Sequence, residues 1–188
     1  MALPQIDPSL LSEKQYLEIE RNAEIKSEFY QGETFAMAGA SVNHNRIISN
    51  LVIEIGYKIK KTSCRIYSSD MRLKVQENGL YAYPDIMVTC DNEEYADEHK
   101  DTLLNPKLII EVLSKSTESY DRGHKFEMFR ALISLNEYIL VSQYKPLVEH
   151  YLRQDDSRWL FTEYTDINST ISLLNIEINI ADIYSNVF

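Results

Sequence analysis

Two apolar stretches, YAYPDIMVT at residues 81–89 and KLIIEVLS at residues 107–114, decide which fold the sequence predicts. The second stretch is an unbroken apolar run apart from Glu111, which is typical of a strand buried on both faces of a mixed sheet. The first stretch predicts another strand and contains Asp85. A buried carboxylate is costly unless it is paired, protonated or bound to a cation. Asp85 and Glu111 are therefore the two residues that most need a chemical explanation.

The remaining segments predict helices and short strands around this sheet. Amphipathic helices are expected over residues 43–61 and 117–132, with an N-terminal helix that starts at a capping box. Hairpins are expected around Gln31-Gly32 and after residue 145, with a short helix at the C-terminus. The predicted order is α–β–β–α–β–β–β–α–β–β–β. This is an α/β fold, with a mixed β-sheet flanked by helices in one domain over residues 1–188.

Composition supports an ordinary soluble globular protein. The chain has 188 residues, of which 44% are hydrophobic and 26% charged, so a disordered or fibrous chain is excluded. No apolar run approaches the ~18–20 residues that cross a bilayer, and the N-terminus does not resemble a secretory signal. Two cysteines, Cys64 and Cys90, are too few for a disulfide scaffold and lack the spacing of a metal site. We therefore expect a cytoplasmic protein with no membrane association.

The formal net charge of −10 argues against uniform binding to nucleic acid, because phosphate neutralisation supplies most non-specific affinity. Positive charge must then be local. One basic cluster comprises Lys58, Lys60, Lys61, Arg65, Arg72 and Lys74. It could form a local surface that binds phosphates, or it could be the solvated end of a helix. The acidic segment 90–105 could be a flap or a solubilising loop.

Two explanations stand for Asp85 and Glu111. They could share a hard cation such as Mg²⁺ or Mn²⁺, which prefers oxygen ligands, or each could pair with an arginine such as Arg72 or Arg122. Lys125 lies on the same face of the predicted helix as Asp121 and could direct its amine towards the two acids. It could equally form a weak i,i+4 pair with Asp121.

The order of several segments resembles the Uma-two family of putative restriction endonucleases, within the PD-(D/E)xK superfamily. These segments are YQGETFAMAGASVNHNRIISNL, RIYSSDMRLKV, YAYPDIMVTCD, PKLIIEVLSKSTESYDRGHKFEMFR and LNEYILVSQ. The resemblance covers about residues 10 to 185. It implies a restriction-endonuclease-like fold and a divalent-metal phosphodiesterase site.

The resemblance assigns roles to individual residues. Pro84-Asp85 and Glu111 would supply the metal-binding acids, and the main-chain carbonyl of Val112 a third oxygen. Leu113 stands where an ExK motif has its lysine, so the resemblance points to Lys125 on the following helix, with Lys115 on the strand as the alternative.

Three other residues have less definite roles; two of them, His44 and Glu33, lie in the resembling segments. His44 could contact phosphate or orient a ligand, or it could be a hydrogen-bonding residue at a helix terminus. Glu28 and Glu33 flank the first hairpin turn, and we expect both to be solvated.

The resemblance therefore implies a bacterial endonuclease that hydrolyses DNA phosphodiester bonds with Mg²⁺ or Mn²⁺ and acts as a homodimer. Two alternatives remain at this point. One is a non-catalytic module that binds nucleic acid or protein on a nuclease fold. The other is a metal-dependent hydrolase of small phosphoesters, which would tolerate an acidic surface better.

Overall fold

A six-stranded mixed sheet forms the centre of the protein, in a computed structural model that describes residues 10–37 and 39–188. β8 lies antiparallel to β6 and parallel to β9, so the sheet is mixed as predicted. All residues of β8 and β9 are buried, which confirms that these strands are covered on both faces. In spatial order the strands are β11 (Trp159–Tyr164), β10 (Val148–Arg153), β9 (Glu137–Ser142), β8 (Leu108–Leu113), β6 (Ile86–Cys90) and β3 (Cys64–Ser68).

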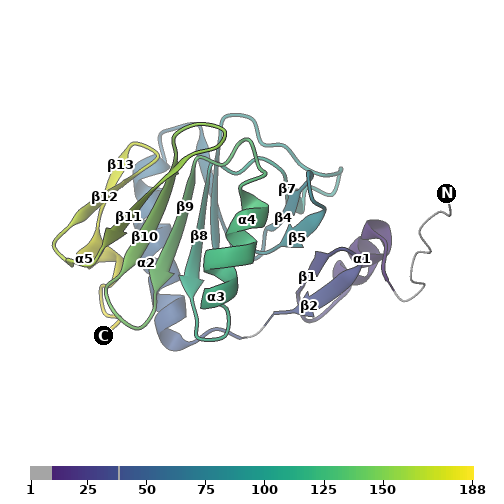
Figure 1. The fold of residues 1–188 in the computed structure, drawn as a ribbon, viewed down its shortest axis with the longest axis horizontal. Helices are drawn as coiled ribbons and strands as arrows, with labels where there is room; N and C mark the ends of the chain where they lie inside the picture. The colour runs from purple at the N-terminus through teal and green to yellow at the C-terminus, as the bar shows by residue number, and fades with distance from the viewer. Residues whose placement is uncertain (1–9, 38) are drawn as a thin grey trace.

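Helices cover both faces of this sheet (Figure 1). α2 (Val42–Ile59) packs on one face together with the hairpin of β12 (Thr170–Leu173) and β13 (Ile176–Asn179) and the short α5 (Ile180–Ile183). The four isoleucine and leucine residues spaced along α2 are buried, as their periodicity predicts. The other face carries one continuous helical segment made of α3 (Glu118–Tyr120), a π-helical turn η1 (Asp121–Lys125) and α4 (Phe126–Phe129).

A second, five-stranded sheet lies beside this helical segment, in the spatial order β2-β1-β5-β4-β7. Its strands are β1 (Ser27–Tyr30), β2 (Glu33–Ala36), β4 (Arg72–Val75), β5 (Leu80–Ala82) and β7 (Thr102–Leu103). The N-terminal helix α1 (Glu13–Glu20) docks on this sheet, where Tyr16 stacks on Phe29 with ring centroids 4.8 Å apart. Its predicted capping box is present, between Ser12 and Gln15.

The expectation of one strand over residues 81–89 is wrong. The stretch divides into β5 and β6, which belong to different sheets. Pro84 stands at the division; it has no N–H for a sheet ladder and it restricts the backbone of Tyr83. The chain therefore leaves one sheet at Tyr83 and enters the next at Ile86, and Asp85 lies at the point of entry.

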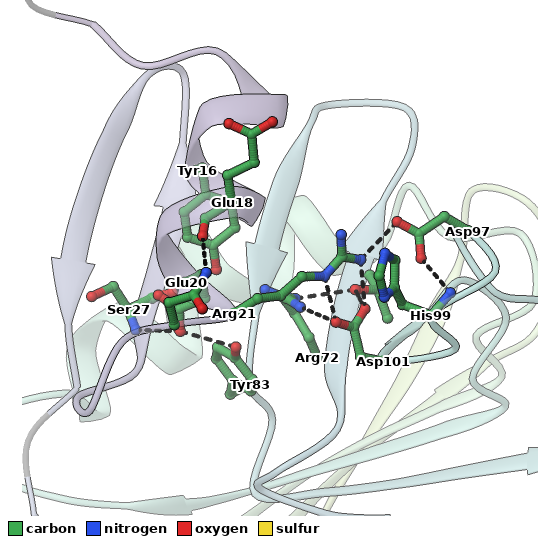
Figure 2. Close-up of polar contacts among 12 residues, drawn as sticks. Tyr16, Glu18, Glu20, Arg21, Ser27, Arg72, Tyr83, Asp97, His99 and Asp101 are labelled. Carbon is green, nitrogen blue, oxygen red and sulfur yellow. Dashed lines mark hydrogen bonds and ion pairs between the residues drawn. The ribbon is translucent and has the colours of Figure 1, made fainter.

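The acidic segment 90–105 is joined to α1 and β4 by ion pairs (Figure 2). Asp101 Oδ2 lies 2.7 Å from Arg21 Nε and 3.0 Å from Arg72 Nη2, and Asp97 Oδ2 lies 2.6 Å from Arg21 Nη2. The hydrogen bond from Arg21 holds the pKa of Asp101 well below its usual range. The buried Arg72 guanidinium lies 5.7 Å from the ring centroids of both Tyr16 and Tyr83. The end of this segment is thus fixed to the fold, so neither a free flap nor a purely solubilising loop describes it.

The two cysteines are joined in a disulfide between the paired strands β3 and β6, where Cys64 lies directly opposite Cys90. The cysteine count and spacing give no reason to expect this bond. Within the described ranges, no helix is long and apolar enough to cross a membrane.

Candidate functional site

Asp85 and Glu111 meet because of the register between β6 and β8. Ile86 pairs with Ile110 in this antiparallel ladder, so the next positions along the two strands are Asp85 and Glu111. The Asp85 N–H lies 3.3 Å from Glu111 Oε2 and donates to it, and Val112 N–H donates to Asp85 Oδ2 at 2.8 Å. The two carboxylates are therefore held side by side at the end of the central sheet.

Lys125 reaches Glu111, the second of these acids, from the opposing helix. Its ammonium lies 2.9 Å from Glu111 Oε1 and 3.9 Å from Asp121 Oδ1. Both Asp121 and Lys125 are buried, as their shared helix face predicts, and the π-helical turn that carries them is a form often found at functional sites. The i,i+4 pair with Asp121 is therefore present, but it is buried and longer than the contact of Lys125 with Glu111.

The other lysine candidate lies elsewhere. Lys115 is exposed, with its ammonium 5.8 Å from the ring centroid of Tyr144. Leu113, at the position of an ExK lysine, is buried in the apolar core between β8 and the helix. Among these three positions, Lys125 alone brings an amine to Glu111.

His44 contacts the first acid from the N-terminal turn of α2. Its Nε2 lies 3.1 Å from Asp85 Oδ2, and its backbone N–H donates to the N-cap Ser41. Its Nδ1 is buried and has no hydrogen-bond partner in the described part of the chain. His44 therefore contacts a site carboxylate through its side chain and lies at the helix terminus through its backbone.

Glu28 is the site residue that sequence reasoning missed. The expectation that it is solvated is wrong, because its side chain is only 13% exposed and its Oε1 lies 3.0 Å from Lys125 Nζ. Glu33, across the turn, is exposed as expected. The available signal was the alternation in SEFY: Phe29 is buried beneath α1, so Glu28 must face the other side of the hairpin, towards the helical segment.

The site carries more negative than positive charge. Four carboxylates, from Glu28, Asp85, Glu111 and Asp121, surround the single ammonium of Lys125 and the imidazole of His44. Burial raises the pKa of the Glu111 carboxyl well above its usual value, although Lys125 opposes this, and burial raises the pKa of Asp121 in the same way. Burial alone would lower the pKa of Lys125, but the neighbouring Glu111, Glu28 and Asp121 carboxylates raise it well above its usual value. This imbalance favours additional positive charge at the site.

The arginine alternative for the two acids does not agree with the structure. Arg72 pairs with Asp101, and Arg122 pairs with Glu149 at 2.8 Å and with Glu118 at 2.9 Å. Neither arginine is paired with Asp85 or Glu111, so structural ion pairing with them does not explain these buried acids.

The basic cluster does not form one local surface that binds phosphates. Arg72 is buried, Lys74 lies 2.7 Å from Glu13, and Lys58 lies 3.8 Å from Glu54. Lys60, Lys61 and Arg65 remain exposed after the end of α2. For these three residues the solvated helix end is the better description.

The residues at the site fit a divalent cation bound by few protein ligands. The described residues contain no group of three or more His, Cys, Asp or Glu side chains arranged to hold a metal. Mg²⁺ does not require one, since it usually keeps several waters and binds through one or two carboxylates. Within the described ranges, the buried Glu111 Oε1 accepts no hydrogen bond of good geometry, although the Lys125 ammonium is close. Asp85 and Glu111 are the pair of carboxylates that could hold the ion.

Comparison with known proteins identifies the family of this chain. Residues 13–181 match the Uma2 family, described as "Putative restriction endonuclease". The chain is 41% identical over 162 residues to the uncharacterized protein sll1609 of Synechocystis sp., covering 86% of this chain and 92% of that protein. It is 35% identical over 154 residues to slr1290 of the same organism, covering 82% and 80%.

A solved structure shares the fold. The crystal structure of a putative nuclease belonging to DUF820 from Anabaena variabilis superimposes with a TM-score of 0.76 at 17% identity, covering 93% of this chain and 98% of that one. The class defined by the fold is thus a restriction-endonuclease-like α/β protein. This chain belongs to the Uma2 family, as the resemblance in its sequence predicts.

Proposed function

We propose that this protein is a divalent-metal-dependent endonuclease that hydrolyses DNA phosphodiester bonds. The observation that carries the proposal is the placement of the Lys125 ammonium 2.9 Å from Glu111, beside Asp85, at the end of the central sheet. Two carboxylates and one lysine are the chemical groups of a PD-(D/E)xK site, with the lysine supplied by the helix instead of the strand.

In this proposal Asp85, Glu111 and the main-chain carbonyl of Val112 would hold Mg²⁺ or Mn²⁺. The bound ion would supply charge neutralisation at the phosphodiester and lower the pKa of a bound water. Lys125 would hold the attacking water and stabilise negative charge that develops on the phosphate oxygens. His44 would orient Asp85, and Glu28 would position the Lys125 ammonium.

A non-catalytic module is the second candidate, and one observation favours it. Lys125 already lies between Glu111 and Glu28, at 2.9 and 3.0 Å, so this ammonium can neutralise part of the acidic cluster without a metal. A protein that uses the fold only for binding would be stable in this arrangement.

Hydrolysis of a small phosphoester has less support. Two surface grooves, of about 400 and about 600 Å³, lie next to the start of α2 and next to α1 respectively. Neither groove is lined by Asp85, Glu111 or Lys125.

We also propose that the protein works as a homodimer; the cytoplasmic location expected from the cysteine count loses support from the Cys64–Cys90 disulfide, since such bonds are rare in a reducing compartment. One site cuts one strand, and a two-fold axis would place two sites on opposite strands of a duplex. Sedimentation of the full chain with and without DNA tests this, and a species that stays monomeric on duplex DNA contradicts it.

Cleavage of supercoiled plasmid and of circular single-stranded DNA, in Mg²⁺ or Mn²⁺ at low salt, tests the proposed activity. The wild type should cleave, and chelation or Asp85→Asn should abolish cleavage, while the exposed control Glu33→Gln should cleave normally. Metal binding that depends on Asp85 without any cleavage favours the non-catalytic module. Cleavage that survives Asp85→Asn refutes the site.

A further inference from the structure

Aromatic side chains lie on the two elements that carry Glu28 and Lys125, which are far apart in the sequence. Phe35 on β2 lies directly opposite Glu28 on β1, so the two side chains are on the same face of the hairpin. Tyr30 shares that face because it lies two residues from Glu28. Since Glu28 contacts Lys125, this is the face turned towards the helical segment. Phe35 is nevertheless 51% exposed.

The helical segment supplies two more rings. His124, next to Lys125, lies with its ring centroid 5.8 Å from that of Tyr30, in an edge-to-face arrangement. Tyr120, one turn earlier, lies 6.0 Å from His124 and is 36% exposed. Burial and the neighbouring Glu28 carboxylate raise the pKa of Tyr120 to about 12. Through His124, the Tyr120 ring is linked to Tyr30 on the hairpin.

We propose that Tyr30, Phe35, Tyr120 and His124, here called the aromatic rim, bind unpaired nucleobases of a DNA strand by stacking beside the acid site. This inference rests on the proposed function, because it assumes a nucleic-acid substrate. It deepens that function by naming the substrate class: single-stranded DNA, or duplex DNA with unstacked bases at the point of cleavage.

The charge of the protein makes stacking the more suitable source of affinity. A chain with a net charge of −10 gains little from phosphate neutralisation, and its site is itself acidic. Stacking of a base on an aromatic side chain contributes about 1–3 kcal/mol and does not depend on base identity. Bases inside an intact duplex are already stacked, so the rim should prefer an unpaired strand.

The exposed ring positions make the test clean, because Phe35 and Tyr120 can be replaced without emptying the core. The probe is an oligothymidylate of about 12 nucleotides with one central 2-aminopurine, a length within the usual range for single-strand sites. Binding is followed by fluorescence in EDTA, where cleavage cannot occur, against the same sequence as a duplex. Tyr57→Leu, at an 81% exposed tyrosine on α2, is the matched control, and Tyr120→Phe keeps the ring.

We expect Phe35→Leu and Tyr120→Leu each to weaken single-strand binding by about 5- to 100-fold, the effect of one lost stacking contact. Tyr120→Phe and Tyr57→Leu should bind like the wild type, and the wild type should bind the duplex more weakly. Unchanged affinity in both leucine variants at the rim, or an equal loss in Tyr57→Leu, overturns the inference.

Failure of the rim and failure of the proposed function are distinguishable. If the wild type cleaves DNA in Mg²⁺ and the leucine variants at the rim bind the oligonucleotide as well as the wild type, the proposed function stands and the stacking role of the rim is refuted. If binding depends on the rim residues but no cleavage occurs in Mg²⁺, the stacking role stands and the proposed nuclease activity is refuted. A wild type that binds no oligonucleotide in EDTA overturns the inference about the rim, and the cleavage assay in Mg²⁺ then decides the proposed function by itself.

Discussion

Removing the Lys125 ammonium should destabilise the protein strongly. Lys125 lies 2.9 Å from Glu111, 3.0 Å from Glu28 and 3.9 Å from Asp121, and its side chain is 8% exposed. Lys125→Met keeps the apolar length of the side chain and leaves these carboxylates without their cation. Breaking a buried ion pair by removing one partner costs about 3–5 kcal/mol.

The assay is urea unfolding at pH 8 in EDTA, with the thermal midpoint as a second measurement. For a chain of this size the expected loss corresponds to a midpoint about 6–20 °C lower. The loss should shrink as the pH falls. The pKa of Glu111 is raised, so the stability that its protonated form contributes is present below its ordinary value of 4.5 and is lost as the pH rises through the folded pKa. In acid, the carboxylates left by Lys125→Met become neutral and need no cation.

Glu111→Gln provides the contrast. It removes a buried negative charge while Lys125 keeps Glu28 and Asp121 as partners, so it should cost little or stabilise the protein by about 1 kcal/mol at pH 8 without metal. If Lys125→Met costs less than about 1 kcal/mol, or if Glu111→Gln costs as much as Lys125→Met, the charge imbalance inferred here is refuted.

Three further predictions concern the surroundings of the site. Glu28→Gln should slow cleavage about 10-fold. Because it lowers the pKa of Lys125, it should also move the alkaline limb of the rate–pH profile to lower pH. Glu33→Gln should leave the rate and the profile unchanged, and a Glu28→Gln profile that does not move contradicts the role of Glu28. His44→Ala should reduce Mg²⁺ affinity or the cleavage rate by about 10- to 100-fold, measured by calorimetry and initial rates, and a wild-type result for both removes His44 from the site. Asp101→Asn should lower the free energy of unfolding by about 1–2 kcal/mol at pH 7. Because the pKa of Asp101 is lowered in the folded protein, its stabilising contribution is present above the ordinary pKa of 3.8 and is lost as the pH falls through the folded pKa. An equal cost of the substitution at pH 2 would contradict the pairing.

The periodicity of apolar residues and the positions of turn residues predict most of the secondary structure of this chain. The four-residue repeat predicts α2 to within two residues at each end, and the unbroken apolar run predicts that β8 is central. The same patterns do not show which strands share a sheet. Pro84 marked the division between β5 and β6, but an apolar run alone cannot distinguish one buried strand from two short ones.

The site was partly accessible from the sequence. Asp85 and Glu111 attract attention because carboxylates are costly in apolar strands, and Lys125 because it shares a helix face with Asp121. The alternation in SEFY indicates which face of the hairpin Glu28 occupies, but it does not reveal the contact with Lys125, which joins residues 97 positions apart and depends on how the hairpin packs on the helix. The Cys64–Cys90 disulfide depends in the same way on strand register, which a spacing of 26 residues does not reveal.

The most direct test of the central claim is the Mg²⁺-dependent cleavage rate of Glu111→Gln on single-stranded DNA, measured beside its free energy of unfolding. The proposed site predicts a protein that is at least as stable as the wild type in EDTA and has no detectable cleavage. Its inactivity could then not be attributed to unfolding. A Glu111→Gln protein that cleaves at the wild-type rate would contradict the assignment of Asp85, Glu111 and Lys125 as a nuclease site.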